Sequence, residues 1–261
     1  MSGFDHTVYW EERLASTDGL QGVGYLGLGQ AFNEWMYKVR RSVFRRVVRR
    51  YLPDLSGASV LDIGSGTGEY LDLWLKCGAR TVNGSDLTQT AVERLGQRYP
   101  GLRISQADIS EPGIDLGRHQ AVSCMDVLFH VVDPVRFDQA IRNLRNCLEP
   151  GGYLLLSDHF LRKPRSGQVH FTTRTLEEYT TVLQKHGLRI VARRPMFHLM
   201  NLPADARSRW LHRWWGTVIR VCERSPAAGG VLGMLLYPLE LLIVGLRREG
   251  VSAEIMVCKA A

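Results

Sequence analysis

The sequence predicts an α/β fold, a doubly wound and mostly parallel sheet with helices on both faces. From residue 57 onward, strand-like apolar runs alternate with amphipathic helical patterns, which is typical of consecutive βαβ units. The chain has 261 residues, of which 45 % are hydrophobic, and this suits one α/β domain with additions. A glycine turn, VLDIGSGTGEY at 60–70, joins the first strand of that pattern to its first helix.

Residues 1–56 precede the alternating pattern and are expected to form a helical cap or lid. Apolar residues recur at three- and four-residue steps over 30–52, which predicts one long helix that ends at Pro53. Five glycines within 19–29 indicate an irregular loop before it. The long helix also carries a basic stripe of Lys38, Arg41, Arg45 and Arg49, which is expected to face solvent. An anionic membrane or a phosphate-bearing acceptor is the alternative partner for this stripe.

The main domain is expected over 57–261. Its helices are predicted at 69–77, 90–98, 134–147 and 175–186, and its strands at 58–63, 81–84, 102–105, 121–125, 153–157, 188–192 and 253–258. Asp133-Pro134 is a typical helix start, and Thr175 with Glu178 forms a predicted capping box. Ligands of such sheets bind at the carboxyl ends of the strands, so those ends are the candidate site.

Residues 195–250 separate the last two predicted strands and are expected to form a helical insertion. The segment contains Trp210, Trp214 and Trp215, several arginines and an apolar run at 231–245. Contact with a membrane surface is one interpretation of this composition. A buried cap helix or a dimer contact is the favoured alternative, because Glu240 interrupts the apolar run.

The composition favours a reduced cytoplasmic protein with no metal site. Its five cysteines show no Cys-x-x-Cys pair and no zinc-like spacing. The N-terminus has no apolar segment like that of a signal peptide, and no run of about 18 apolar residues predicts a spanning helix. The net charge of +7 permits an anionic partner, and a position at the membrane periphery stays open.

The ligand on the glycine turn is predicted to be a nucleoside without phosphates. Gly64, Gly66 and Gly68 follow the spacing Gly-x-Gly-x-Gly, whereas dinucleotide-binding turns have Gly-x-Gly-x-x-Gly. Glu69 directly follows the last glycine, and its carboxylate suits a helix N-terminus but would repel a diphosphate. Asp86 ends the next strand 18 residues after Gly68, where a carboxylate accepts hydrogen bonds from ribose hydroxyls.

Five segments together resemble the motifs of class I S-adenosylmethionine-dependent methyltransferases. LDIGSGTGEY resembles the first motif, GSD at 84–86 the second-strand acid, and QADI at 106–109 the acid beside adenine. CMDVLFHV at 124–131 resembles the fourth-strand motif, and LEPGGYLLLSD at 148–158 the fifth. The resemblance covers about residues 57–194 and the last strand. It implies a seven-stranded, Rossmann-like sheet whose last strand runs antiparallel.

The resemblance also implies the cofactor S-adenosyl-L-methionine, with S-adenosylhomocysteine as product. The three glycines would pack against the methionine part, and Asp62 would orient its amino group. Asp86 would hold the ribose and Asp108 the adenine, while Met125 and Asp126 would border the reacting methyl group. The complete predicted cofactor-binding set is Asp62, Gly64, Ser65, Gly66, Gly68, Asp86, Leu87, Asp108, Ile109 and Met125.

Catalytic and acceptor residues are predicted next to these motifs. An acceptor hydroxyl or ammonium must lose a proton, and a histidine suits that role. His130 is the best-placed base, with simple packing at a helix entry as the alternative, and Asp158 and His159 are further catalytic candidates. Phe129 stands where the family often has glutamate. The predicted acceptor-binding set is Phe129, His170, Arg174 and Tyr25, in which Arg174 would clamp an anionic acceptor.

Several cap residues are predicted to close over the cofactor, as N-terminal helices do in related enzymes. Ordinary packing of the cap is the equally weighted alternative. The residues concerned are Tyr9, Trp10, Glu11, Tyr25, Tyr37 and Arg40.

The leading functional hypothesis is methyl transfer to oxygen, nitrogen or carbon of a small molecule by in-line displacement. The alternative is a peripheral membrane methyltransferase that acts on a lipid or lipid-linked acceptor. A non-enzymatic S-adenosylmethionine sensor is a less favoured class. Nucleic-acid methylation is disfavoured, because the segment after the fourth strand reads MDVLF instead of Asn/Asp-Pro-Pro-aromatic, and no cysteine follows a proline. The oligomeric state stays open.

Overall fold

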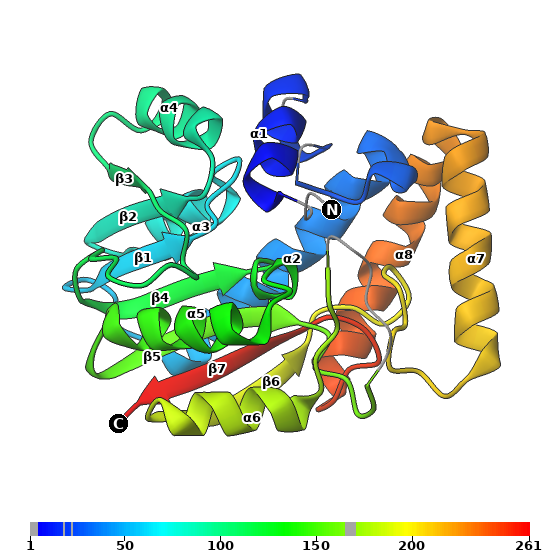
Figure 1. The fold of residues 1–261 in the computed structure, drawn as a ribbon. Coiled ribbons are helices and arrows are strands. Elements are labelled where there is room, and N and C mark those ends of the chain that lie inside the picture. The colour runs from blue at the N-terminus through cyan, green and yellow to red at the C-terminus, as the bar shows by residue number, and fades with distance from the viewer. Residues whose placement is uncertain (1–4, 18, 22, 165–170) are drawn as a thin grey trace.

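The computed structural model describes residues 5–17, 19–21, 23–164 and 171–261. Its centre is a seven-stranded sheet in the order β3-β2-β1-β4-β5-β7-β6, shown in Figure 1. Strands β1 to β5 are parallel, and β7 runs antiparallel to both β5 and β6. The predicted doubly wound sheet with one antiparallel strand is therefore confirmed. The strands are β1 (Ser59–Ile63), β2 (Thr81–Asp86), β3 (Arg103–Gln106), β4 (His119–Met125), β5 (Leu148–Asp158), β6 (Leu188–Pro195) and β7 (Glu254–Ala260).

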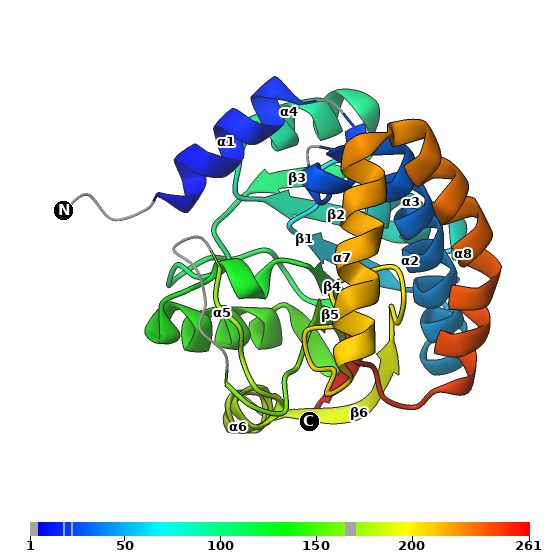
Figure 2. The same ribbon diagram turned by 90° about the vertical axis from the view of Figure 1, so that its right-hand side faces the viewer.

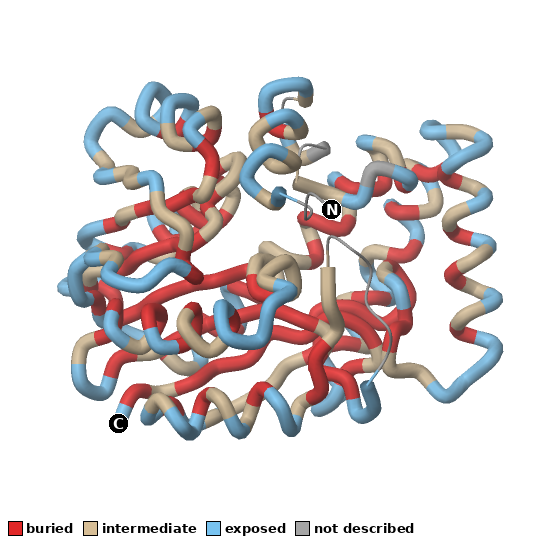
Figure 3. The backbone as a smooth tube through the Cα atoms, in the orientation of Figure 1, coloured by how far each residue is buried: buried red, intermediate tan, exposed pale blue. Residues whose placement is uncertain are grey.

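Helices cover both faces of the sheet because successive strand side chains point to opposite sides. In β1, Val60 joins the apolar core on one face and Leu61 the core on the other. The first core lies under α2 (Gly29–Tyr51), α3 (Glu69–Lys76), α7 (Arg209–Arg224) and α8 (Pro226–Leu246). The second lies under α5 (Pro134–Asn146) and α6 (Leu176–Lys185). Figure 3 shows the buried backbone concentrated in the central strands.

Local sequence signals determine where these helices begin. The Asp133 carboxylate accepts hydrogen bonds from the backbone N–H groups of Val135 and Arg136, and Pro134 occupies the first turn of α5. Thr175 and Glu178 form the predicted capping box of α6. Helix α4 (Gln89–Arg98) begins at Thr88, whose hydroxyl accepts from the N–H of Ala91. These caps place the preceding loops at the carboxyl ends of the strands.

The segment before β1 is helical, as expected for a cap. It contains α1 (His6–Ser16), two short 3₁₀ turns, η1 (Gly19–Gln21) and η2 (Leu26–Leu28), and the long helix α2. The predicted basic stripe on α2 is only partly solvated. Arg41 forms a bidentate ion pair with Glu69, and the Lys38 ammonium lies 3.4 Å from the centre of the Trp35 ring. These two cations therefore serve packing within the protein.

The insertion between β6 and β7 consists of α7 and α8, which meet at Ser225. Figures 1 and 2 show this pair beyond the carboxyl ends of the parallel strands, with α8 alongside α2. Strand β6 extends three residues further than predicted, because Arg193, Arg194 and Pro195 pair with the start of β7. In the described residues one helix, Pro226–Leu246, is long and apolar enough to cross a membrane by length and composition.

Candidate functional site

A cavity of about 970 Å³ lies where strand order reverses, at the carboxyl ends of β1, β2 and β4. Its floor is the glycine turn after β1, and its walls are the segments that follow β2, β3 and β4. Helix α1 contributes Thr7, Trp10 and Leu14 from the opposite side. A volume of this size matches small-molecule and cofactor sites.

The glycine turn adopts a backbone that side chains would obstruct. Gly64 has φ = 72° and Gly66 has φ = 50°, both in the left-handed region. A Cβ atom at Gly64 would lie 2.3 Å from Cγ2 of Val127, which itself lines the cavity. The N–H groups of Gly64 and Ser65 donate to the Ser85 carbonyl, so the turn is fastened to the end of β2. Gly68 does not line the cavity and is the N-cap residue of α3.

Asp86 lies beside the turn and binds its backbone at Gly66. One carboxylate oxygen accepts from the N–H of Gly66 at 2.8 Å, and the other accepts from the N–H and hydroxyl of Thr88. Burial raises the pKa of this carboxyl above its ordinary value, and the hydrogen bonds oppose that shift. Asp86 and its neighbour Leu87 both line the cavity.

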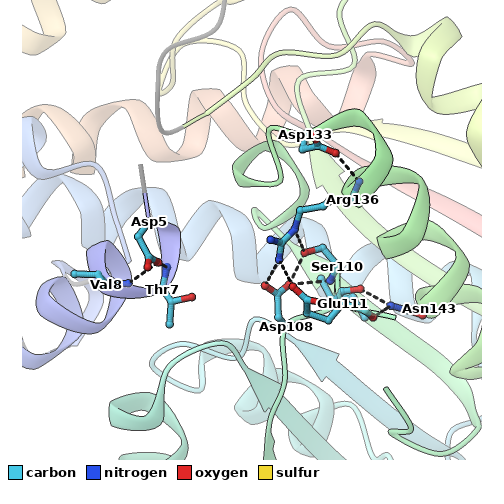
Figure 4. Close-up of polar contacts among 10 residues, drawn as sticks. Asp5, Thr7, Val8, Asp108, Ser110, Glu111, Asp133, Arg136 and Asn143 are labelled. Carbon is cyan, nitrogen blue, oxygen red and sulfur yellow. Dashed lines mark hydrogen bonds and ion pairs between the residues drawn. The ribbon is translucent and has the colours of Figure 1, made fainter. Parts of the chain in front are cut away.

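Asp108 and Ile109 line the next part of the wall, after β3. One Asp108 oxygen accepts from the N–H and hydroxyl of Ser110, and the other pairs with Arg136 at 2.7 Å. Figure 4 shows Arg136 reaching from α5 to Asp108, Ser110 and Glu111. The role of Arg136 had no sequence signal, because the residue occupies an ordinary polar position of an amphipathic helix.

Asp62 is fully buried at the end of β1. Its Oδ1 accepts from the Ser123 hydroxyl at 2.5 Å, while its Oδ2 has no hydrogen-bond partner in the described chain. Burial raises the pKa of this carboxyl to about 7. Asp62 does not line the cavity, but Ser65, whose hydroxyl donates to the Asp62 carbonyl, does. A buried carboxylate oxygen without a donor suits a ligand that carries an ammonium group.

The end of β4 and the segment after it form the wall opposite Asp86 and contribute Met125, Asp126, Phe129 and His130. Asp126 has φ = 60°, a conformation that residues with a side chain seldom adopt. Ser157 at the end of β5 holds it, because the Ser157 hydroxyl contacts both the backbone N–H and the carboxylate of Asp126. Strain that neighbours maintain in this way is frequent at functional sites.

Aromatic rings surround His130. The Phe129 ring centre lies 4.2 Å from the imidazole centre, and the Trp10 ring meets it edge-on at 4.9 Å. The 3₁₀ turn η3 (Leu128–His130) places both Phe129 and His130 on the cavity wall. The predicted base and the predicted acceptor contact are thus neighbours under the α1 lid.

Helix α1 is fastened over the cavity by specific contacts. Asp5 caps it by accepting from the N–H groups of Thr7 and Val8, as Figure 4 shows. The Glu11 carboxylate accepts from the N–H groups of Gln89 and Thr90, at the start of α4. A hydrogen bond from the Thr90 hydroxyl is the largest cause that lowers the pKa of Glu11. Glu11 therefore acts as a latch between the lid and the sheet domain.

The other predicted cap residues have different surroundings, and of these four Tyr37 is the one that lines the cavity. Tyr37 lines the cavity, and burial raises its pKa to about 12. Arg40 forms an ion pair with Asp126 and so ties α2 to the wall after β4. The Tyr9 hydroxyl accepts a hydrogen bond from Arg13 within α1. Tyr25 is 52 % exposed and its ring lies 6.5 Å from that of Trp215, outside the cavity wall.

Arg174 supports a loop and does not form the predicted anion clamp. Its guanidinium is buried and donates to the backbone carbonyls of Leu128, Val131 and Val132. It also lies 3.8 Å from the centre of the Phe137 ring. With its donors directed at three carbonyls, Arg174 supports the turn that carries Phe129 and His130. The sequence alone does not distinguish an arginine that binds an anion from one that supports a loop, because both can stand directly before a helix.

Asp158 and His159 are also placed apart from the cavity. Asp158 is buried and accepts from the Tyr179 hydroxyl at 2.5 Å and from the N–H of His159 at 2.6 Å. Neither residue is part of the cavity lining. The prediction that Asp158 and His159 contact the acceptor is therefore not supported by their position. His170 lies outside the described residues.

Comparison with known proteins decides the family. The model of the methyltransferase domain matches residues 35–221, well over half of the chain. The chain belongs to the methyltransferase-domain family. A probable S-adenosylmethionine-dependent methyltransferase of Mycobacterium tuberculosis, MT3114, is 32 % identical over 174 residues, which are 63 % of this chain and 62 % of the relative. This methyltransferase domain thus spans less than two thirds of that relative's length.

Other relatives of the methyltransferase domain differ in their named substrates. A tRNA U34 carboxymethyltransferase of Idiomarina loihiensis is 31 % identical over 64 % of this chain and 47 % of the relative. A ubiquinone biosynthesis O-methyltransferase of Xanthomonas oryzae is 37 % identical over 40 % of this chain and 44 % of the relative. Shared residues therefore indicate the cofactor domain and leave the acceptor open.

Solved structures confirm the fold over the whole chain. Magnesium protoporphyrin IX methyltransferase of Synechocystis, solved with bound S-adenosylmethionine, covers 100 % of both chains with a TM-score of 0.60 and 16 % identity. The amino pentose methyltransferase CalS10 of Micromonospora echinaspora, also solved with this cofactor bound, covers 94 % of this chain and 98 % of its own, with a TM-score of 0.56 and 16 % identity. At such identities the likeness concerns the fold alone.

Proposed function

We propose that this protein transfers the methyl group of S-adenosylmethionine to an oxygen, nitrogen or carbon atom of a small-molecule acceptor. One observation carries the proposal: a single cavity joins the glycine turn and the acids of β2 and β3 to Phe129 and His130 after β4. The first group of residues suits a nucleoside cofactor, and the second provides room and a base for an acceptor. The family match supports the same reaction class.

The residues present fit this cofactor. The turn at Gly64 and Gly66 gives a backbone surface without side chains, and Asp86 and Asp108 offer carboxylates on the ribose and adenine sides. Asp62 lies behind this surface and does not line the cavity, whereas Ser65, whose hydroxyl donates to the Asp62 carbonyl, does. When bound, the cofactor supplies a methyl group on a sulfonium, an activated leaving group for in-line displacement.

The chain contributes positioning and a base. Trp10 and Phe129 border the space beside His130 and limit the orientations open to an acceptor there. His130 accepts the proton that an acceptor hydroxyl loses as its oxygen attacks the methyl group, or the proton that an acceptor ammonium loses before its nitrogen attacks. The α1 lid, latched through Glu11, keeps water away from that proton transfer.

Calorimetry with S-adenosylmethionine tests the cofactor half of the proposal. Asp86→Ala is expected to weaken binding at least about tenfold, because it removes a buried acceptor and frees the Gly66 N–H. Asp54→Ala is the control, since Asp54 is an exposed acid remote from the cavity. Unchanged affinity in both Asp86→Ala and Gly66→Val would refute the site assignment.

Labelling identifies the acceptor class. The protein is incubated with methyl-labelled S-adenosylmethionine and a host extract, which is then separated into aqueous small-molecule, lipid, protein and nucleic-acid fractions. Label in the aqueous small-molecule fraction is the expected result. His130→Gln should lower the rate about 10²- to 10⁴-fold while calorimetry gives the parent's cofactor affinity. Label confined to protein or nucleic acid would overturn the assignment of a small acceptor.

A lipid or lipid-linked acceptor is the second candidate, because α8 presents exposed leucines at its surface. The same labelling experiment separates the two candidates, since label would then enter the lipid fraction.

A further inference from the structure

Helix α8 presents a continuous apolar face to solvent. Six side chains of this face are between 45 % and 77 % exposed. They recur at three- and four-residue steps, so they lie along one side of the helix over most of its length. We name this surface the α8 face, and it consists of Val231, Met234, Leu235, Leu239, Leu242 and Leu246. Monomeric soluble proteins rarely expose an apolar patch of this extent without a partner.

The opposite side of α8 is fixed to the protein. A Cβ atom at Gly233 would lie 2.7 Å from the Trp35 ring, so α8 packs closely on α2 there. The Glu240 carboxylate is fully buried and accepts from the backbone N–H groups of His198 and Leu199. A buried carboxylate bound to the loop after β6 holds α8 in the domain. The helix therefore lies on the protein's surface, and its length and apolar composition do not make it a span in this fold.

Arginines border both ends of the α8 face. At its C-terminal end, Arg247 and Arg248 follow the helix and are exposed. Exposed Arg46 of α2 lies beside them, since its guanidinium is 3.0 Å from where a Cβ of Gly245 would be. At the N-terminal end, exposed Glu223 and Arg224 close α7 directly before α8. An apolar strip with cations at its borders is complementary to a bilayer with anionic headgroups.

A second copy of the chain matches this surface less well. A two-fold contact through the α8 face with the two helices parallel would bring the basic C-terminal ends, which carry Arg46, Arg247 and Arg248, against each other. Like charges at a contact oppose association, whereas lipid phosphates would neutralise them. Charge complementarity therefore selects the membrane as the partner.

We infer that the α8 face is a membrane-docking surface, which inserts its leucines at the level of the acyl chains of an anionic bilayer while Arg46, Arg247 and Arg248 contact lipid phosphates. This inference is independent of methyl transfer, because no residue of the α8 face lines the cavity. Figure 1 places α8 on the side of the carboxyl strand ends, where the cavity also lies.

Vesicle co-sedimentation of the full chain tests this inference. The vesicles consist of phosphatidylcholine alone or of phosphatidylcholine mixed with phosphatidylglycerol, at low and at high salt. The face variant is Leu235→Glu/Leu239→Glu. The matched control, Leu75→Glu/Val135→Glu, places the same two charges at exposed apolar positions of α3 and α5. Thermal unfolding and S-adenosylmethionine calorimetry are measured on each preparation to verify folding.

The parent and the control should pellet with the anionic vesicles and bind less at high salt. The face variant should partition at least about tenfold less, because two apolar side chains no longer enter the bilayer. A parent that stays in the supernatant at low salt, or a face variant that pellets like the parent, would overturn the inference. A concentration-dependent dimer that only the face variant loses, without vesicle binding by the parent, would assign the face to a second copy. Loss of cofactor binding with vesicle binding retained would count against the proposed function alone.

Discussion

Replacement of Gly64 by alanine is the sharpest test of how the glycine turn is built. The substitution adds one methyl group at a residue with φ = 72°. A left-handed conformation costs a residue with a side chain about 1–2 kcal/mol. The new Cβ would also lie 2.3 Å from Cγ2 of Val127, far inside van der Waals contact. Relief of such overpacking costs about 1–3 kcal/mol more. We expect Gly64→Ala to lower the free energy of unfolding by about 2–5 kcal/mol.

Gly113→Ala is the matched control for this measurement. Gly113 has φ = 78° but no atom within 4 Å of its virtual Cβ, so it shares the backbone cost without the clash. Urea titrations give the free energy of unfolding of both variants. The Gly64→Ala variant should lose about 1–3 kcal/mol more than the Gly113→Ala variant, and this difference is the cost of the clash. Val127→Ala in the Gly64→Ala background removes the obstructing methyl group and should recover most of that difference. If Gly64→Ala and Gly113→Ala unfold at the same urea concentration, the argument for a forced glycine fails.

Three further predictions concern charged groups. Burial raises the pKa of Asp62 to about 7, so in the cofactor-free protein its ionisation removes stability as pH rises from about 4 to about 7. The free energy of unfolding of Asp62→Asn relative to the parent should therefore increase between pH 5 and pH 8 in urea titrations. Arg174→Met should cost about 2–4 kcal/mol, because it leaves three loop carbonyls without their donor, whereas a pure anion clamp would leave the unfolding curve unchanged. Glu11 has a lowered pKa, so its latch is complete above about pH 4.5 and is lost as pH falls through the folded-state pKa. Glu11→Gln should weaken calorimetric cofactor affinity a few-fold at pH 7 with nearly unchanged thermal stability, and an unaltered affinity would separate the latch from binding.

Local patterns were sufficient to predict the sheet and the cofactor side of the cavity. Apolar runs, caps and turn residues act within a few positions, and the alternation of strands and helices then places every strand end at one edge. Asp86 and Asp108 line the cavity for that reason. The helix starts at Asp133 and Thr175 follow from side-chain bonds to backbone groups two or three residues away.

Contacts between residues that are distant in sequence could not be predicted from local patterns. Arg174 and Arg136 are both arginines near the start of a helix, yet one supports a loop and the other pairs with Asp108. The role of each arginine depends on which group the fold places beside it. That group is a carboxylate 28 positions away in sequence for Arg136 and a carbonyl 46 positions away for Arg174. The exposed side of α8 was unpredictable for the same reason, because an apolar run of this length shows no polar side. Only its packing against α2 determines which leucines remain outside.

Helix α2 contacts both the cavity wall and the packed side of α8. Its Tyr37 lines the cavity, and its Arg40 pairs with the left-handed residue Asp126 of the cavity wall. Two residues before Tyr37, Trp35 packs under Gly233, and two residues after Arg40 the Ser42 hydroxyl contacts the Tyr237 hydroxyl of α8. The cap and the insertion, which lie outside the segments that resemble the family motifs, are thus joined to the cofactor domain at the point where Asp126 is held.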